Sequence, residues 1–400
     1  MSSPLRIALI ADSFPPLQNS AAIQLRDLAR EIALQGHFLT IILPAADLKE
    51  LWNLESADGF QILRLKAPQT KGINYVARTI GEFLMPFVMY WHLKKSPLTN
   101  EKWSGLIWYS PSIFLGFFTK FLKKKSKCNA YLIVRDIFPE WAVDLGLIKY
   151  RGLPYYFFLA IARYQYSIAN IIGVQTMGNL SYFKNWMRKS NRRLEVLQNW
   201  LGKPKLSGCS IQLNQTILAG RKVFVYAGNM GVAQNILILL KLAQKFQSQA
   251  NVGFLFVGQG SEVFLLKSFA EQHQLNNIVF YDEIHPDEIP GLYAQCIAGM
   301  IALDHRHKSH NIPGKFLTYI QNGLPVLASV NSGNDIASLI RDENVGQVCE
   351  SNRIEDIFKS AENILEQISK DINLPSRCRK LFDRDFSSEQ AARQILKALI

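Results

Sequence analysis

One pattern, repeated along the chain, limits the possible folds: a short apolar run, a polar loop, then an amphipathic stretch. The run "LRIALIADSFPP" predicts a buried strand that ends in a loop. Next, "AAIQLRDLAREIALQGH" predicts a helix closed by Gly36, and "FLTIILPA" predicts another strand. The runs "GLIWYS", "AYLIVRD", "IIGVQT" and "LEVLQNW" continue the series. Strands that alternate with helices favour a mainly parallel sheet covered on both faces, so we predict an α/β fold.

A polar segment containing glycine and proline interrupts this alternation at residues 201–220, "LGKPKLSGCSIQLNQTILAG". The strand runs restart at "KVFVYAGNMG" and continue through "VGFLFVGQGSE", "NIVFYDE", "AGMIALD", "LPVLAS" and "VGQVCE". A chain of 400 residues, 48% of them hydrophobic, is long enough for two domains. We therefore expect two doubly wound, Rossmann-like domains that face a cleft. They are predicted at 1–200 and 221–375, with a linker at 201–220 and a helix at 376–400 that packs back onto the first domain.

The net charge of +13 is unevenly distributed. Residues 1–200 contain 25 Lys and Arg against 13 Asp and Glu, whereas residues 201–400 contain 20 against 19. The first half is therefore expected to face an anionic partner, and phospholipid headgroups, nucleic acid and polyphosphates are the candidates. Ordinary basic surface chemistry is the alternative.

The five cysteines are scattered and contain no Cys-x-x-Cys pair. This suits a reducing cytoplasm and argues against a zinc ribbon or a disulfide framework. The apolar run at residues 7–11 is too short for the core of a signal peptide and ends at Asp12. We therefore expect a cytoplasmic protein.

Two stretches of the first half combine aromatic and basic residues. In "SIFLGFFTKFLKKKSK", Phe117, Phe118 and Phe121 are expected to enter the headgroup region of a membrane beside the lysines. The stretch "INYVARTIGEFLMPFVMYWHLKK" is strongly apolar, but Arg78 and Glu82 make it a poor spanning segment. Both stretches suit helices that lie in a membrane surface. A buried core helix followed by a solvated charge run is the alternative.

Glycine turns follow several strands of the second half. The turns at Gly228 in "VYAGNMGVAQN" and at Gly258 in "LFVGQGSE" leave backbone N–H groups that can hold a phosphate. Such turns occur in any α/β fold, so the signal is weak by itself. In "VFYDEIHPDEIPGLYAQC", backbone groups near Glu283 and Ile284 are expected to read the edge of a nucleotide base.

The stretch "HNIPGKFLTYIQNGLPVLAS" predicts a helix that begins at Pro-Gly-Lys and a strand that follows Gly323. The helix dipole and Lys315 together make a site for a diphosphate, and Gly314 lets the backbone approach the ligand closely. The alternative is a lysine on a solvated first turn. Because a lysine adds to the positive end of the dipole, we favour an anion there.

In this order, the motifs resemble glycosyltransferase family 4 with the GT-B fold. The resemblance covers essentially the whole chain. It is strongest to the WbuB-type transferases of bacterial O-antigen and capsule clusters, assigned as L-fucosamine transferases. It rests on "DSFPP", "VRDIFPEWAVDLG", "IIGVQT", "VLQNW", "YAGNMGVAQ", "FVGQGSE", "DEIPGLYAQC" and "GKFLTYIQNGLPVLA".

The resemblance implies a nucleotide-sugar-dependent hexosyltransferase. The donor would be a UDP-sugar, in particular UDP-N-acetyl-L-fucosamine, held by the C-terminal domain. The acceptor would be a polyprenyl-diphosphate-linked sugar used for lipopolysaccharide or capsule. Such an enzyme would bind the inner face of the cell membrane peripherally through its first domain, without nucleic acid.

Several positions depart from the family pattern. The family has two glutamates separated by seven residues where this chain has His310 and Thr318, and the second typically holds the ribose. The family also often has an arginine and a lysine where this chain has Asn229 and Gln234. Ribose binding is therefore expected from Thr318, from backbone, or from another carboxylate. Asn311 is assigned to the donor site with these residues.

Two loops of the first domain supply further candidates, one from the resemblance and one from its place at the end of a strand. Gln18, Asn19 and Ser20, in "DSFPPLQNSAAIQ", are expected to face the donor diphosphate and the acceptor. Arg135 and Asp136, at the end of "VRDIFPEW", are expected to point at the cleft, where the carboxylate would accept a proton or orient the acceptor hydroxyl. The alternative is an Arg–Asp pair that only ties down a loop.

The histidines of "LDHRHKSHN", at 305, 307 and 310, raise the question of a metal site. Their alternation on a loop is awkward for one tetrahedral site, and GT-B enzymes generally work without a metal. We therefore expect no metal cofactor and assign His310 to a phosphate or sugar contact. Asp136, His310 and Lys315 are the candidate catalytic residues.

Two other functions remain open on the sequence alone. One is a soluble GT-B nucleotide-sugar enzyme such as a 2-epimerase, which needs no lipid acceptor. The other is a non-enzymatic protein that binds nucleic acid through its basic half.

Overall fold

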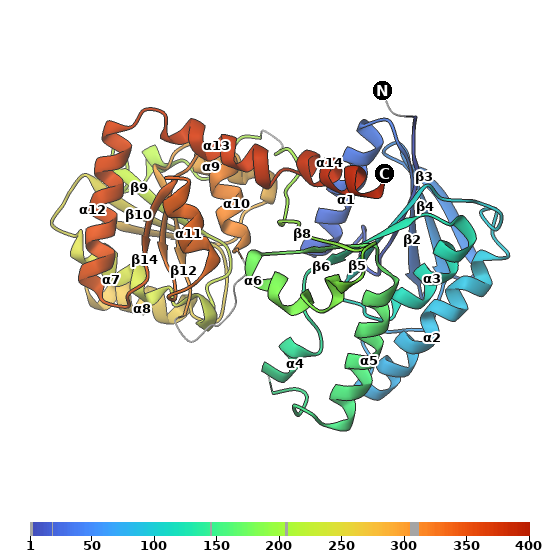
Figure 1. Ribbon diagram of the computed structural model, residues 1–400. Coiled ribbons are helices and arrows are strands. Elements are labelled where there is room, and N and C mark those ends of the chain that lie inside the picture. The colour runs from blue at the N-terminus through green and yellow to red at the C-terminus, as the bar shows by residue number, and fades with distance from the viewer. Residues whose placement is uncertain (1–2, 18, 145, 205–206, 305–311) are drawn as a thin grey trace. The chain divides into compact units, whose positions relative to one another are not determined.

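The computed structural model describes residues 3–17, 19–144, 146–204, 207–304 and 312–400 (Figure 1). The chain divides into two compact units. Unit 1 comprises Met1–Gly202 and Ser388–Ile400, and unit 2 comprises Lys203–Ser387. Each unit is a parallel sheet with helices on both faces, which confirms the predicted α/β fold class.

Within the described part of unit 1, eight strands form one sheet in the order β3-β4-β2-β1-β5-β6-β7-β8. All neighbours are parallel except β3 and β4, which form an antiparallel hairpin at the edge. The strands are β1 (Arg6–Ile10), β2 (Phe38–Ala45), β3 (Trp52–Ala57), β4 (Phe60–Lys66), β5 (Gly105–Ser110), β6 (Asn129–Val134), β7 (Ile171–Val174) and β8 (Arg193–Val196).

Successive residues of β1 enter different cores. Ile7 and Leu9 pack with α1 and α14 on one face of the sheet, while Ala8 and Ile10 pack with α2, α3 and α5 on the other (Figure 1). The strand is therefore apolar on both sides, as expected for a covered parallel sheet. The helices are α1 (Ser20–Leu34), α2 (Tyr75–Leu93), α3 (Leu115–Ser126), α4 (Glu140–Asp144), α5 (Leu153–Ile168), α6 (Met177–Leu180) and α14 (Ser388–Leu399).

Unit 2 has a six-stranded parallel sheet, in the part that the structure describes, with the order β11-β10-β9-β12-β13-β14. Its strands are β9 (Lys222–Ala227), β10 (Val252–Val257), β11 (Ile278–Tyr281), β12 (Ala298–Ala302), β13 (Val326–Ser329) and β14 (Gly346–Cys349). Its helices are α7 (Leu237–Lys245), α8 (Val263–Gln272), α9 (Ile289–Tyr293), α10 (Gly314–Gln321), α11 (Asp335–Asp342), α12 (Ile354–Lys370) and α13 (Leu374–Asp385).

The structure differs from the sequence-based prediction in two segments, the expected linker at 201–220 and the expected helix at 376–400. Ile211, Leu213 and Leu218 are buried, and Gln295 of unit 2 binds the backbone of residues 211 and 213, so part of the segment at 201–220 packs on unit 2. The stretch 376–400 is not one helix. It is interrupted at Phe386 and Ser387, so α13 stays with unit 2 and only α14 joins unit 1.

Helix α2 is the longest apolar helix of unit 1, so it is the helix to compare with a membrane-spanning segment. Neither it nor any other helix in the described ranges has the length and hydropathy needed to cross a bilayer.

Candidate functional site

The sheet of unit 2 has the strand order of dinucleotide-binding folds. Numbered from its own first strand, the order is 3-2-1-4-5-6, and the order reverses between β9 and β12. Ligands of open α/β sheets bind outside the carboxyl ends of the strands at such a reversal. The loop after β9 contains Gly228, and the segment after β12 leads to Lys315 in α10. Gly228 and Lys315 therefore lie at the end of the sheet where folds of this type bind ligands.

The loops after β9, β10 and β11 are hydrogen-bonded to one another. The N–H of Gly228 donates to the carbonyl of Val257 at 2.8 Å, and the N–H of Gly258 donates to the carbonyl of Tyr281 at 3.0 Å. Gly258 has a φ of +139°, and a Cβ there would lie 2.2 Å from the carbonyl oxygen of Gly228. Gly258 is therefore required for the close backbone packing of this edge.

Lys315 lies in the first turn of α10 and is half-buried. Its ammonium lies over the ring of Tyr226, with Nζ 4.8 Å from the ring centroid. Burial lowers the pKa of Lys315 to about 8. No carboxylate among the residues that the structure describes forms an ion pair with it. A desolvated cation without a counter-ion, beside a helix N-terminus, is suited to an anionic ligand.

Thr318 follows Lys315 on the next part of the helix and is half-buried. Its hydroxyl donates to the carbonyl of Lys315 at 2.9 Å and also interacts with Tyr293. The oxygen of Thr318 can still accept one hydrogen bond, so the predicted contact to ribose stays a prediction. Gly314 is exposed, and a Cβ there would meet no atom within 4 Å.

The polar residues that replace the cations of the family pattern bind each other. The Nδ2 of Asn229 donates to Oε1 of Gln234 at 3.1 Å, and the same oxygen accepts from the N–H of Gly231 at 3.1 Å. This network holds the loop after β9 in shape. If Asn229 or Gln234 bound a phosphate, its side chain would have to do so while it keeps these hydrogen bonds, or else give them up.

Glu283 and Ile284 follow β11. Glu283 is exposed and its Oε2 accepts a hydrogen bond from Nε2 of Gln259 at 2.7 Å, while Ile284 is half-buried. Gln259 also uses its carbonyl to accept from the N–H of Met230. These contacts place Glu283 at the same sheet edge as Gly258, and its carboxylate is a candidate for the ribose contact that the family pattern leaves open.

His310 and Asn311 lie outside the described residues, as do Gln18, His305 and His307. Nothing follows from the structure about the roles predicted for them. In the described ranges, no group of three or more metal-ligating side chains is found.

Asn19 and Ser20 open helix α1 in unit 1. The Oδ1 of Asn19 accepts from the N–H of Ala22 and from the hydroxyl of Ser13, both at 2.8 Å, so the side chain caps the helix. Ser20 is exposed at the first helical position. The donor-binding role predicted for these two residues stays a prediction.

Arg135 and Asp136 follow β6 and behave differently. Arg135 is buried, donates to the carbonyl of Leu197 at 2.8 Å, and lies 4.6 Å from the ring centroid of Trp200. The expectation that its side chain points at a ligand is wrong, because the guanidinium fixes the end of the neighbouring strands. Asp136 is exposed at the surface of the unit, and desolvation raises the pKa of its carboxyl group although the nearby Arg135 opposes the shift.

Asp12 is a candidate that the sequence analysis did not single out. It directly follows β1, and the order of the unit 1 sheet reverses between β1 and β5. Burial raises the pKa of Asp12, and the cations Lys71 and Arg78 oppose this shift. The charges of Asp12 and Asp136 both act on Tyr109 at the end of β5. The signal in the sequence was an acidic residue at the end of the first strand.

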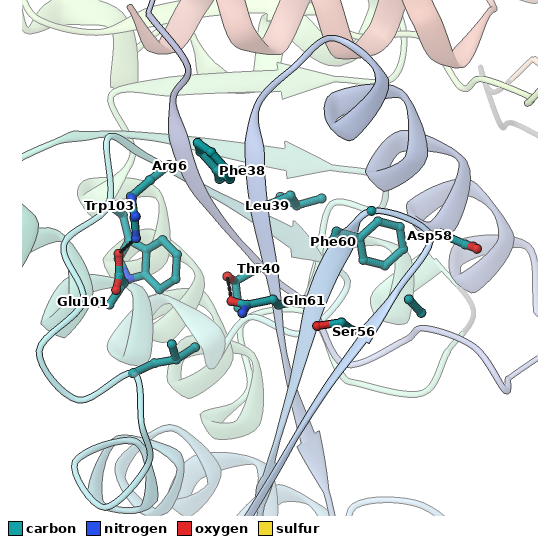
Figure 2. A pocket seen from close by; sticks show the side chains of 13 residues that line it. Arg6, Phe38, Leu39, Thr40, Ser56, Asp58, Phe60, Gln61, Glu101 and Trp103 are labelled. Atoms are coloured by element: carbon teal, nitrogen blue, oxygen red, sulfur yellow. Dashed lines mark hydrogen bonds and ion pairs between the residues drawn. The ribbon is translucent and has the colours of Figure 1, made fainter.

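The opposite edge of the unit 1 sheet has a shallow hollow of about 480 Å³. Figure 2 shows its lining, which includes Arg6, Phe38 and Phe60 at the amino ends of β1, β2 and β4. Arg6 forms an ion pair with Glu101 there. Because the hollow lies at the amino ends of the strands, it is not the position where this fold binds its ligands.

Part of unit 2 matches a known family. Residues 212–380 match the family Glycosyl transferases group 1. The probable glycosyltransferase WbjE of Pseudomonas aeruginosa is 24% identical over 225 residues, which are 55% of this chain and 56% of that protein. The match therefore spans little more than half of the relative's length.

Solved structures resemble the whole chain. The crystal structure of Anabaena HepE in complex with UDP and glucose has a TM-score of 0.62 at 14% identity and covers 98% of this chain and 99% of that chain. WaaG, a glycosyltransferase involved in lipopolysaccharide biosynthesis, has a TM-score of 0.58 at 14% identity, with coverage of 98% and 99%. Sucrose-phosphate synthase from Thermosynechococcus elongatus has a TM-score of 0.66 at 14% identity, with coverage of 98% and 97%.

At these identities the likeness to solved structures shows the fold, and it confirms the predicted GT-B class. The family match of unit 2 and the relative from Pseudomonas aeruginosa add sequence similarity to this likeness. Together they show a chain with the GT-B fold whose second unit resembles the group 1 glycosyl transferases.

Proposed function

We propose that the chain is a glycosyltransferase that moves a sugar from a UDP-sugar to a polyprenyl-diphosphate-linked sugar acceptor. The observation that carries this proposal is the ammonium of Lys315, held against Gly228 at the strand-order reversal of unit 2. The position suits a diphosphate, because the cation and the N–H groups of α10 converge there. The HepE structure, whose complex contains UDP and glucose, supports a nucleotide sugar as donor.

The chemistry of transfer assigns roles to these groups. The bond between the sugar and the UDP diphosphate breaks, and the leaving oxygen gains negative charge that Lys315 stabilises together with the N–H groups of α10. The acceptor hydroxyl forms the new glycosidic bond and loses its proton to a carboxylate, for which Asp136 and Asp12 are the candidates. Because protein groups neutralise the diphosphate, the proposed reaction needs no divalent metal.

The finer assignment follows the resemblance to WbuB-type transferases. It names N-acetyl-L-fucosamine as the transferred sugar and O-antigen, lipopolysaccharide or capsule as the product class. The relation to WaaG, described as involved in lipopolysaccharide biosynthesis, agrees with that class. A lipid-linked acceptor would place the protein on the inner face of the cell membrane as a peripheral protein.

Thermal-shift screening tests the proposed donor. A ligand at about one hundred times its dissociation constant stabilises the folded state by about 2.7 kcal/mol, so UDP and the correct UDP-sugar should raise the melting temperature. ADP, GDP and RNA serve as controls. Stabilisation by RNA alone would favour the nucleic-acid alternative. Conversion of the UDP-sugar without any acceptor would favour the 2-epimerase.

A further inference from the structure

Helix α2 has two apolar faces. One buries Met85, Met89 and Leu93 in the core of unit 1. The other is exposed and has large apolar residues at intervals of three and four, which are Val76, Ile80, Phe83, Leu84, Phe87 and Trp91. Val76 is 72% exposed, Ile80 55% and Trp91 56%. A surface helix of a globular protein normally has polar residues on its outer face, so this stripe points to an apolar partner.

Aromatic contacts continue the stripe across the neighbouring helices. Phe83 and Phe87 of α2 contact Phe117 of α3, and the ring of Phe117 stacks on Tyr164 of α5 with centroids 4.3 Å apart. The three helices cover the same face of the unit 1 sheet (Figure 1). Exposed apolar residues extend along α4, α5 and the segment between them, and these are Trp141, Leu147, Tyr150, Leu153, Tyr156 and Phe157.

Cations lie beside the aromatic rings of this layer. Lys95 lies 3.9 Å from the ring centroid of Trp91, Lys94 lies 4.8 Å from that of Tyr90, and Lys120 lies 5.1 Å from that of Tyr164. Lysines beside tryptophan and tyrosine are typical of surfaces at the depth of lipid headgroups.

Two acidic side chains of the same layer have partners. Glu82 pairs with Arg78 at 2.8 Å, and Glu140 accepts a hydrogen bond from the hydroxyl of Tyr182 at 2.9 Å. Arg78 balances the charge of Glu82, and Lys and Arg outnumber Asp and Glu in residues 1–200 by 25 to 13, so the charge of this half of the chain is mainly positive. A broad apolar stripe flanked by cations is complementary to an anionic bilayer.

We propose that the outer face of α2, continued by α5, docks unit 1 on an anionic phospholipid bilayer. This face, defined by Val76, Ile80, Leu84 and Trp91, is the docking face. This proposal rests on the proposed function in one respect: the lipid-linked acceptor would lie in the bilayer on which unit 1 docks. The helix would lie along the membrane surface, because Arg78 and Glu82 prevent insertion across it.

Of the two stretches expected at a membrane surface, the docking face uses the one that forms α2 and not the one that forms α3. Phe118 of α3 is 0% exposed, and Phe117 and Phe121 are covered by rings of α2, so Phe118 does not reach a membrane. Lys123 donates to the carbonyl of Ile168 at 2.6 Å, and Lys125 donates to the carbonyl of Thr99. Helix α3 therefore supports the docking face from the inside.

Vesicle flotation tests this proposal with the full chain. The probes are vesicles of phosphatidylcholine alone and of phosphatidylcholine mixed with phosphatidylglycerol. The wild type should bind the mixed vesicles. The triple variant Val76→Ser, Ile80→Ser, Leu84→Ser should bind them at least about tenfold more weakly, since each change removes apolar contact with the bilayer. The double variant Lys94→Glu, Lys95→Glu should lose binding and mimic the effect of high salt on the wild type.

The matched control lies on α8 of unit 2. Phe264 is 79% exposed and Leu265 58%, so Phe264→Ser with Leu265→Ser removes similar apolar surface away from the docking face, and vesicle binding should not change. Melting temperatures should be equal for all variants, because the substituted side chains are exposed.

Three results would overturn the proposal: no binding of wild type to the mixed vesicles, equal binding by the triple variant, or an oligomer that the triple variant converts to a monomer. UDP binding measured on the same samples separates the two proposals. Normal vesicle binding without UDP binding would refute the proposed donor and leave the docking face standing.

Discussion

The ammonium of Lys315 lies against the α-carbon of Gly228. A methyl group added at Gly228 would come within 2.9 Å of Cε and 3.1 Å of Nζ of the lysine. The lysine reaches its position over Tyr226 only because residue 228 has no side chain. A glycine at the end of β9 and a lysine at the start of α10 thus lie side by side, although they are far apart in the sequence.

The substitution Gly228→Ala should damage both the fold and the site. Its φ of +130° is unfavourable for any residue with a Cβ, so we expect the free energy of unfolding to fall by about 1–3 kcal/mol. UDP should also bind more weakly, because the new methyl displaces Lys315. Denaturant unfolding and calorimetric titration with UDP measure the two effects.

Alanine substitutions at two other glycines serve as comparisons for the stability loss expected in Gly228→Ala. Gly258→Ala should destabilise more than Gly228→Ala, since its methyl meets backbone that cannot move aside. Gly314→Ala should leave the free energy of unfolding unchanged or raise it by about 0.4–1 kcal/mol, because no atom crowds that position. A loss of stability in Gly314→Ala as large as in Gly228→Ala would contradict the packing described for this edge.

The affinity for UDP should depend on pH through Lys315. Burial lowers the pKa of its ammonium from 10.5 to about 8, so the free protein loses this charge as the pH rises above 8. The diphosphate of UDP is already fully ionised at pH 8, since the second pKa of a phosphate ester is about 6. UDP binding should therefore weaken between pH 7.5 and 9.5, by up to about tenfold per unit. Lys315→Arg keeps its charge over this range, and a variant that still binds UDP should show a flat profile.

Asp12 and Asp136 should contribute to transfer and not to donor binding. Burial raises the pKa of both carboxyl groups, and both lie at carboxyl ends of strands near the reversal of the unit 1 sheet. Changing the true proton acceptor to asparagine should reduce transfer by about 10²–10⁴-fold while UDP affinity stays the same. Transfer should decline on acidification at a pH above the ordinary pKa of aspartate, 3.8, because the carboxylate becomes protonated. Full transfer activity in both Asp12→Asn and Asp136→Asn would remove these residues from the reaction.

Transfer should not require a divalent metal. Lys315 and the N–H groups of α10 supply the positive charge that a metal would otherwise provide at the diphosphate. Turnover should be the same with EDTA as with magnesium. Loss of turnover in EDTA that magnesium or manganese restores would contradict the proposed mechanism.

Much of the fold could be predicted because most strands are buried on both faces and appear as short apolar runs. The hairpin of β3 and β4 was not predicted, since β3, "WNLESA", lies at the edge of the sheet, is largely exposed and has no continuous apolar run. The Asp58-Gly59 pair was the available signal. Both residues have positive φ, 53° and 83°, as a two-residue hairpin turn requires.

The positions of the candidate site residues were predictable where they depend on the backbone, and less so where they depend on side-chain packing. Gly228, Gly258 and Lys315 were identified from glycine turns and a helix start. The sequence could not show that Arg135 turns inward to Leu197, or that α2 covers the phenylalanines of α3. Such outcomes depend on which strands and helices become neighbours.

Calorimetric titration of UDP against wild type, Lys315→Ala and Lys267→Ala tests the central claim most directly. Lys267 is an exposed lysine of α8, so its variant controls for the loss of one positive charge. We expect Lys315→Ala to weaken UDP binding by about 1.5–3 kcal/mol, the range for a hydrogen bond to a charged group, and Lys267→Ala to bind like the wild type. Equal UDP affinity in all three proteins would contradict a diphosphate site at the start of α10.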